Sequence, residues 1–376
     1  MAPQVNASSS SETYRVIKAD SQALDDHLKS GLKTYEAFLR QASDKHYDLW
    51  RQAAELGLPE GQFFYGECHN YGLGTPVNKS KAIEWLTKAS DQDHARAQLV
   101  LGVLLTASKL TEDAARQGLR LWERAAEHNL ADAQYLLGIT YCATRDRADI
   151  GFRFLQSAAH QEHAKAQFEL SVCYFKGLGC TSNAQESLLW LQKAASQEYP
   201  TAQYILALSY AEGKIVTLNF SNAAQLLRKA ADNGHAKAQF ELGRYYYIGQ
   251  GVEQSYERAI PWFIAAAKQD QVTAQFLLGN CYFEGTGTSQ NYAEAVRWYQ
   301  RAANQGFTGA QMRLVQCYSE GLGVAKDPQK AYRWFLVGGK DNPEITPEKL
   351  ALIEVNMSET QVREAHNWAT NWKPVK

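Results

Sequence analysis

The sequence lacks features that mark several common classes of protein. It has no run of about 18 apolar residues, so we expect no membrane-spanning helix. Its 39 basic and 40 acidic side chains nearly cancel, which argues against nucleic acid or an anionic membrane as the main partner. Residues 1–14 contain neither a basic cluster nor an apolar stretch. We therefore expect a cytoplasmic location, or a periplasmic or secreted one if a signal peptide has been removed.

Motifs of catalytic and metal-binding sites are also missing. The sequence has no Gly-x-Ser-x-Gly, no His-Glu-x-x-His, no phosphate-binding loop and no Cys-x-x-Cys. His160 and His163 end a predicted helix, where a polar or cationic residue suits the helix dipole better than a metal. We predict no catalytic residue, no cofactor and no metal site.

What the sequence does contain is a repeated unit, clearest in residues 236–271. The unit reads as two helices joined by a turn at Gly249 and Gly251, where glycine supplies the positive φ that ends the first helix. Units begin at these residues: Pro59, Ala95, Ala131, Ala164, Pro200, Ala236, Val272 and Thr308. Units of this kind stack on their neighbours and bury a continuous core, so the repeats predict one elongated α-solenoid.

The recurring residue types have packing roles. Small residues at the third and eighth positions, such as Ala238 and Gly243, let a helix approach its neighbour closely. Bulky residues on the second helix are predicted to fill the groove opposite. These are Trp85, Trp190, Trp262, Trp298 and Trp334.

This pattern of Ala-x-Ala-Gln-Phe-x-Leu-Gly, Gly-x-Gly and Ala-x-x-Trp resembles the Sel-one-like repeat (SLR) family, which is related to tetratricopeptide repeats. The resemblance implies an all-α, right-handed α-solenoid of two-helix repeats with N- and C-terminal capping helices. We expect a disordered tail over residues 1–18, capping helices over 19–58, eight repeats over 59–343 and C-terminal capping helices over 344–376. Ser358 is the predicted N-cap of the last helix.

The cysteines are predicted to be buried and reduced. Cys281 and Cys317 share the tenth position of adjacent repeats, which places them about 8–10 Å apart, too far for a disulfide. Cys173 and Cys180 lie within one repeat and are predicted to be the only plausible pair.

A partner-binding surface is expected on the first helices, which line the concave face of such solenoids. Positions 5, 9 and 12 of each repeat fall on one helical stripe. The predicted protein-binding residues are Phe168, Phe175, Tyr204, Phe240, Arg244, Tyr247, Phe276, Asn280 and Phe283. For the aromatics at position 5 the competing interpretation is packing between repeats. Position 12 varies more, so Phe175, Tyr247 and Phe283 are the stronger candidates for peptide recognition.

Three functions are consistent with these features. The first is a non-catalytic scaffold or adaptor that binds a protein or peptide on its concave surface, with a regulatory role as one option, as the resemblance implies. The second is a dedicated inhibitor or immunity protein for one partner, such as a bacterial toxin. The third is a small-molecule-binding protein or an enzyme such as a β-lactam hydrolase, a role linked to some cysteine-rich members of the family. This chain lacks their cysteine pair in each repeat. The oligomeric state is not predicted.

Overall fold

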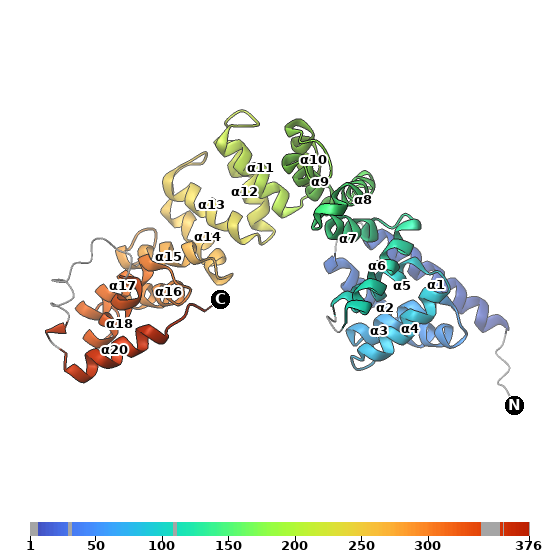
Figure 1. The fold of residues 1–376 in the computed structure, drawn as a ribbon, viewed down its shortest axis with the longest axis horizontal. Coiled ribbons are helices and arrows are strands. Elements are labelled where there is room, and N and C mark those ends of the chain that lie inside the picture. The colour runs from blue at the N-terminus through green and yellow to red at the C-terminus, as the bar shows by residue number, and fades with distance from the viewer. Residues whose placement is uncertain (1–6, 29–31, 108–110, 340–353, 356, 376) are drawn as a thin grey trace. The chain divides into compact units, whose positions relative to one another are not determined.

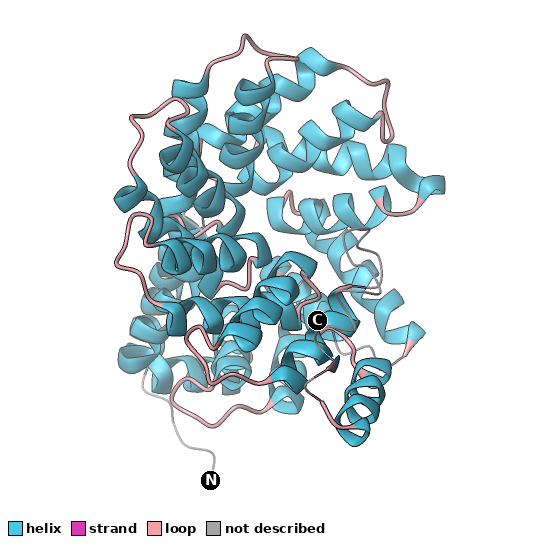
Figure 2. Cartoon of the chain, turned by 90° about the vertical axis from the view of Figure 1, so that its left-hand side faces the viewer, coloured by secondary structure: helices cyan, strands magenta, loops and turns pink. Residues whose placement is uncertain are grey.

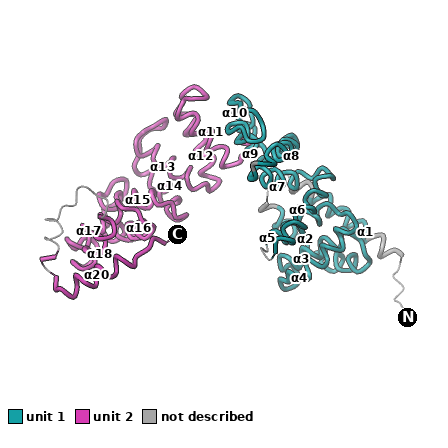
Figure 3. The backbone as a smooth tube through the Cα atoms, in the orientation of Figure 1, with its two compact units in different colours: residues 1–193 teal, residues 194–376 magenta. Residues whose placement is uncertain are grey.

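The computed structural model describes residues 7–28, 32–107, 111–339, 354–355 and 357–375. The chain divides into two compact units, residues 1–193 and 194–376 (Figure 3). All regular secondary structure in the described part is helical, with loops between the helices (Figure 2). The prediction of an all-α solenoid is therefore confirmed. None of the described helices is long and apolar enough to span a bilayer.

Unit 1 begins with two long helices, followed by the helix pairs of repeats 1 to 4 (Figure 1). Its helices are α1 (Ala7–Leu28), α2 (Leu32–Glu55), α3 (Pro59–Tyr71), α4 (Lys79–Asp91), α5 (Ala95–Ala107), α6 (Glu112–Glu127), α7 (Ala131–Cys142), the short 3₁₀ helix η1 (Arg145–Arg147), α8 (Ala148–His160), α9 (Ala164–Lys176) and α10 (Ala184–Ser196), whose last residues belong to unit 2.

Unit 2 contains repeats 5 to 8 and a final helix. Its helices are α11 (Pro200–Glu212), α12 (Phe220–Asp232), α13 (Ala236–Ile248), α14 (Tyr256–Lys268), α15 (Val272–Glu284), α16 (Tyr292–Asn304), α17 (Thr308–Glu320), α18 (Pro328–Gly338) and α20 (Glu359–Asn371). The two helices pack together in repeats 1 to 3 of unit 1 and in repeats 5 to 8 of unit 2, and within each unit the second helix of these repeats packs against the first helix of the next repeat.

Two backbone positions in each repeat determine where its helices end. The first helix of most repeats ends at a glycine in the left-handed region, such as Gly249 with φ 74°. The second-to-last residue of repeats 1 to 7 also has a positive φ. Glycine takes this position at Gly234, but Glu162 and Glu198 take it elsewhere with φ near 60°. Because glutamate is strained there, the sequence did not reveal this second turn position.

The core is built from a few repeated positions. Leucines at the seventh position are buried in repeats 2 to 8, and alanines of the second helices are fully buried against them. A Cβ at Gly243 would lie 2.7 Å from the Phe263 ring, and one at Gly279 would lie 2.5 Å from the Tyr299 ring. The groove at the eighth position is therefore filled by Phe263 and Tyr299, each of which directly follows one of the predicted tryptophans. Trp262 and its counterpart Trp298 are only half-buried, so the expected groove-filling role was wrong for them.

A chain of side-chain amides, which we call the glutamine ladder, connects successive repeats. In repeats 4 to 8 the buried glutamine at the fourth position donates to an alanine carbonyl of the preceding repeat, as Gln239 does to Ala231 (3.1 Å). Its own oxygen accepts from a glutamine near the end of its repeat, and Gln269 Nε2 lies 2.8 Å from Gln239 Oε1. Equivalent amide pairs are Gln92 with Gln62, Gln161 with Gln134, and Gln305 with Gln275. The ladder explains why glutamine recurs at a buried position.

The N-terminal segment differs from its prediction. Helix α1 begins at Ala7, so the expectation of a disordered tail was wrong for residues 7–18. Thr13, Ile17, Asp20 and Leu24 follow helical spacing and are all buried. Two of these four are polar, which hid the period. Asp20 is satisfied by the indole N–H of Trp50 at 2.8 Å.

The C-terminal helix α20 covers the last repeat, as the sequence suggested for a capping helix. The Ser358 hydroxyl accepts from the backbone N–H of Gln361, whose side chain returns a bond to Ser358, and together they form a capping box. Trp368 and Trp372 pack edge-on against Trp334, with centroids 5.3 and 6.1 Å away. Residues 340–353, 356 and 376 of the predicted C-terminal region lie outside the described residues.

Candidate partner-binding surface

Two successive repeats of unit 2 hold an aromatic side chain in the same way at the end of the first helix. In repeat 6 the ring of Tyr247 lies edge-on to Tyr256, with centroids 4.9 Å apart. Gln254 Nε2 donates both to the Tyr247 carbonyl (3.0 Å) and to the Tyr256 hydroxyl (3.1 Å). Repeat 7 reproduces these contacts at 5.0, 2.9 and 3.0 Å with Phe283, Tyr292 and Gln290. In both repeats the aromatic at position 12 is half-buried, and its ring contacts a tyrosine whose hydroxyl accepts from the glutamine of the turn.

The two predicted residues at position 9 of these repeats differ in how freely their side chains can contact a partner. Arg244 is 43% exposed and pairs with Glu241 of the same helix at 2.9 Å. Exposed pairs of this kind contribute little stability, so its guanidinium can exchange partners. Asn280 Oδ1 accepts the hydroxyl of Tyr299 at 2.8 Å, which ties this amide to the second helix of its own repeat.

At position 5 the aromatic rings lie between the helices of their own repeat and the start of the next. Phe276 lies 6.0 Å from Tyr299 and 4.9 Å from Phe307 by ring centroids. Tyr204 and Phe240 are half-buried in the same way, against His235 (4.8 Å) and Phe263 (6.2 Å) respectively. These contacts favour a role for position 5 in packing between repeats, while part of each ring remains accessible.

In unit 1 the predicted pair Phe168 and Phe175 lies on helix α9. Phe168 is half-buried, whereas Phe175 is 60% exposed and is among the most exposed large apolar side chains described. Position 9 is apolar in repeats 2 to 4, where Val103 is 40% exposed and Ile139 and Val172 are half-buried. The first helices of these repeats therefore present apolar side chains that the fold leaves partly uncovered.

The same stripe is covered in repeat 1. Phe63, Glu67 and Asn70 occupy positions 5, 9 and 12, and all three are buried. The hydroxyl of Tyr35 on α2 donates to Glu67 Oε2, and Asn70 Nδ2 donates to Glu67 Oε1 at 3.0 Å. The N-terminal helices thus remove repeat 1 from the candidate surface.

Glu67 is a buried carboxyl group that forms no ion pair with a cationic side chain among the described residues. Burial raises its pKa to about 7, although the hydrogen bonds from Tyr35 and Asn70 and the charge of Lys79 act in the opposite direction. Lys79 Nζ donates to the Asn70 carbonyl at 2.9 Å. Asn70 therefore lies between the lysine and the Glu67 carboxyl group. The acid is therefore partly protonated near neutral pH and belongs to the cap rather than to a catalytic site.

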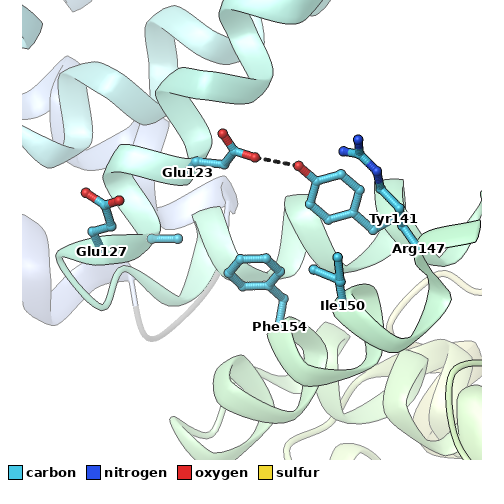
Figure 4. A pocket seen from close by; sticks show the side chains of 7 residues that line it. Glu123, Glu127, Tyr141, Arg147, Ile150 and Phe154 are labelled. Atoms are coloured by element: carbon cyan, nitrogen blue, oxygen red, sulfur yellow. Dashed lines mark hydrogen bonds between the residues drawn. The ribbon is translucent and has the colours of Figure 1, made fainter.

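An open pocket of about 470 Å³ lies between α6, α7, η1 and α8 of unit 1 (Figure 4). It is lined in part by Glu123, Tyr141, Arg147 and Phe154. The Tyr141 hydroxyl donates to Glu123 Oε1 at 2.6 Å, and the Arg147 guanidinium lies 5.5 Å from the ring centre. Partial burial, followed by the bond to Glu123, raises the pKa of Tyr141.

Sequence reasoning did not select this pocket. The sequence feature that could have indicated the pocket is a tyrosine at the eleventh position of most repeats, flanked by charged residues that change from one repeat to the next. These tyrosines are Tyr141, Tyr174, Tyr210, Tyr246, Tyr282 and Tyr318.

The cysteines also differ from expectation. All six are free thiols, and the nearest sulfurs belong to Cys142 and Cys173, which are 3.8 Å apart. Cys180 instead directs its thiol to the Cys173 carbonyl at 3.7 Å. The prediction of Cys173 and Cys180 as the only plausible pair was therefore wrong, because Cys142, at position 12 of repeat 3, faces position 10 of repeat 4. No three His, Cys, Asp or Glu side chains are placed to share a metal ion in the part of the chain that the structure describes.

Successive antiparallel helix pairs, left-handed glycine turns and the glutamine ladder define a helical repeat protein of the α-solenoid class. The sequence profile of the Sel1 repeat matches residues 59–94, 95–130, 131–163, 164–199, 200–235, 236–271, 272–307 and 308–337. The chain therefore belongs to the Sel1 repeat family, which confirms the resemblance seen in the sequence. The eight matches begin at the same residues as the repeats found there.

Several known proteins are similar to this chain. DAP3-binding cell death enhancer 1 from Mus musculus is 33% identical over 148 residues, which cover 38% of this chain and 28% of that protein. Chitin synthase regulatory factor 3 from Schizosaccharomyces pombe is 32% identical over 126 residues, or 33% of this chain and 13% of that protein. The chain thus spans less than a third of the length of these curated relatives.

Among solved structures, a Sel1 repeat protein from Oxalobacter formigenes superposes with a TM-score of 0.60 at 25% identity, covering 82% of this chain and 90% of that one. Proteins with Sel1 repeats generally mediate protein–protein interactions.

Proposed function

We propose that this protein is a non-catalytic adaptor that binds a protein or peptide partner through its first helices. In unit 2 the contact residues are Tyr247 and Phe283, with Arg244 beside them. In unit 1 the contact residue is Phe175. The observation that carries the proposal is the duplicated arrangement in which the rings of Tyr247 and Phe283 pack edge-on against Tyr256 and Tyr292, whose hydroxyls accept from Gln254 and Gln290.

Rigid aromatic side chains suit recognition because they supply contact area without losing much conformational freedom on binding. The Tyr247 and Phe283 rings are half-buried, so their orientation is set before a partner arrives. Such preorganisation lowers the entropic cost of association. The names of two curated relatives support a protein partner, since one is named for binding a protein and the other for regulating an enzyme.

Affinity capture with quantitative mass spectrometry would test the proposal. The unmodified chain would be compared with a double variant, Tyr247→Ala and Phe283→Ala, and with Phe175→Ala. Leu189→Ala is the matched control, because Leu189 is a 44% exposed apolar side chain on a second helix. Circular dichroism would confirm that each variant is folded.

A partner that is bound by the Leu189 control and lost from the stripe variants supports the proposal. A direct titration with that purified partner should then show a loss of about tenfold or more in affinity for each aromatic removed. Equal recovery with all variants would show that binding lies elsewhere.

A further inference from the structure

Repeats 3 to 8 have a tyrosine at position 11, and several of these tyrosines lie beside charged side chains of the second helices. At the junction of repeats 2 and 3 the hydroxyl of Tyr141 donates to the carboxylate of Glu123, at 2.6 Å. Tyr174 and Tyr282 each have a carboxylate nearby as well, from Glu186 and Glu294 respectively. Negative charge therefore lies near three of the six tyrosines, whereas Lys330 Nζ lies 5.5 Å from the ring centre of Tyr318.

The junction of repeats 5 and 6 has the opposite arrangement. Tyr246 is only 2% exposed, and its hydroxyl oxygen accepts from two arginines. Arg258 Nη2 donates at 2.7 Å, and Arg228 Nη2 donates to the same oxygen from the preceding repeat. The Arg258 guanidinium lies 4.2 Å above the tyrosine ring, and the Arg228 guanidinium lies 5.8 Å from the half-buried ring of Trp262.

These two cations have no ion-pair partner among the described residues. Other arginines do have one, among them Arg124, Arg244, Arg297 and Arg301. Two guanidiniums that share one neutral oxygen repel each other, and an anion between them would reverse the sign of that interaction. Each guanidinium has five N–H donors, of which the structure commits one to Tyr246.

We propose that Arg228, Arg258 and Tyr246 form a binding site for an oxyanion, either a carboxylate or a phosphoryl group. Arginine pairs bind such groups well because their planar forks match two oxygens at once. Tyr246 acts as the positioning residue that holds the two guanidiniums together. Its own hydroxyl hydrogen has no acceptor among the described groups, so it too is available for an anion. The site uses none of the stripe residues and does not rest on the adaptor function.

The test is a titration followed by NMR of the full chain labelled with ¹⁵N-arginine. The probes are inorganic phosphate and acetate, each at constant ionic strength against sodium chloride. A short glycine-flanked phosphoserine peptide and its serine counterpart form a further arm. Saturable shifts of the Arg228 and Arg258 side-chain signals are expected with phosphate or acetate. Stronger binding of the phosphopeptide than of free phosphate would identify a partner-borne group, and equal binding a free anion.

Variants separate a built site from general attraction. Arg258→Gln and Arg228→Gln should each weaken binding about tenfold or more, and Tyr246→Phe should weaken it by a smaller factor. Arg301→Gln is the matched control, because Arg301 also lies over a tryptophan, Trp298, but pairs with Asp270 at 3.6 Å. Its affinity should be unchanged. Non-saturable shifts that chloride reproduces, or equal losses in all four variants, would overturn the proposal.

Discussion

The glutamine ladder makes a quantitative prediction at repeat 5, one of the places where it is interrupted. In repeat 5 the buried Gln203 donates to the Ala195 carbonyl at 3.3 Å, but its Oε1 has no hydrogen-bond partner among the described residues. The ladder position that should supply the partner is Asn233, whose side chain is one methylene shorter than the glutamine found in repeats 1, 3, 6 and 7. Asn233→Gln should therefore complete the ladder.

The expected gain follows from the cost of an unpaired buried acceptor, which is about 1–3 kcal/mol, reduced by the side-chain freedom that a longer residue loses. A net stabilisation of about 1 kcal/mol is expected. The backbone already suits glutamine, because Asn233 has φ −82° and ψ 14° while Gln269 in the equivalent place has φ −93° and ψ 23°. The reverse change, Gln269→Asn, removes the partner of Gln239 and should cost about 1–3 kcal/mol.

Urea unfolding followed by circular dichroism would measure the overall change. Hydrogen exchange would locate it, since repeat arrays do not always unfold in one step. Protection should rise in repeats 5 and 6 of Asn233→Gln and fall in repeats 6 and 7 of Gln269→Asn. The reasoning fails if Gln269→Asn is as stable as the unmodified chain, or if Asn233→Gln leaves exchange at repeat 5 unchanged.

Three further predictions concern other parts of the molecule. Because the pKa of Glu67 is raised to about 7, the folded state binds its proton more tightly than the unfolded state, and this residue's contribution to stability is lost as pH rises from about 4.5 through 7. Glu67→Gln should therefore be more stable than the unmodified chain by up to about 3 kcal/mol at pH 8, and by little at pH 4. Urea titrations at the two pH values would measure the difference, and a difference that does not change with pH would contradict the prediction. Diamide oxidation should link Cys142 to Cys173, whose sulfurs are 3.8 Å apart, and peptide mass spectrometry should show that link in Cys180→Ser but not in Cys173→Ser; a Cys173–Cys180 link would refute it. Gly251→Ala and Gly234→Ala both place alanine at positive φ, but only at Gly251 would the Cβ meet a backbone oxygen, that of Phe220 at 2.2 Å. Gly251→Ala should therefore lower the free energy of unfolding by about 1–3 kcal/mol more than Gly234→Ala does, as measured by urea unfolding. Equal losses in the two variants would show that the close contact is not the cause.

The repeating part of the fold was predictable because its physical requirements recur at fixed positions. A glycine such as Gly249, which must adopt positive φ, and an alanine such as Ala259, which must be fully buried, leave the same mark in most units. Helix α1 left no such mark, because Thr13 and Asp20 are polar yet buried, and their role depends on partners such as Trp50 in another helix.

The candidate surface was only partly predictable for a related reason. Position 12 could be identified as variable, but the contacts around Tyr247 involve Gln254, which lies in a turn whose conformation the spacing does not specify. The convergence of Arg228 and Arg258 on Tyr246 requires three helices to be placed together. Cys142 was missed because it faces the next repeat rather than its own.

The cover that α2 places over repeat 1 limits the size of any ligand of unit 1. With Phe63, Glu67 and Asn70 buried, only repeats 2 to 4 offer a free first-helix stripe in that unit. Neighbouring helices pack about 10 Å apart, so the open track is roughly 30 Å long. An extended chain advances about 3.3 Å per residue and would fill that track with about nine residues. For the adaptor function proposed above, unit 1 would therefore accommodate a short linear motif, and lengthening a bound peptide beyond this footprint should add no contacts there.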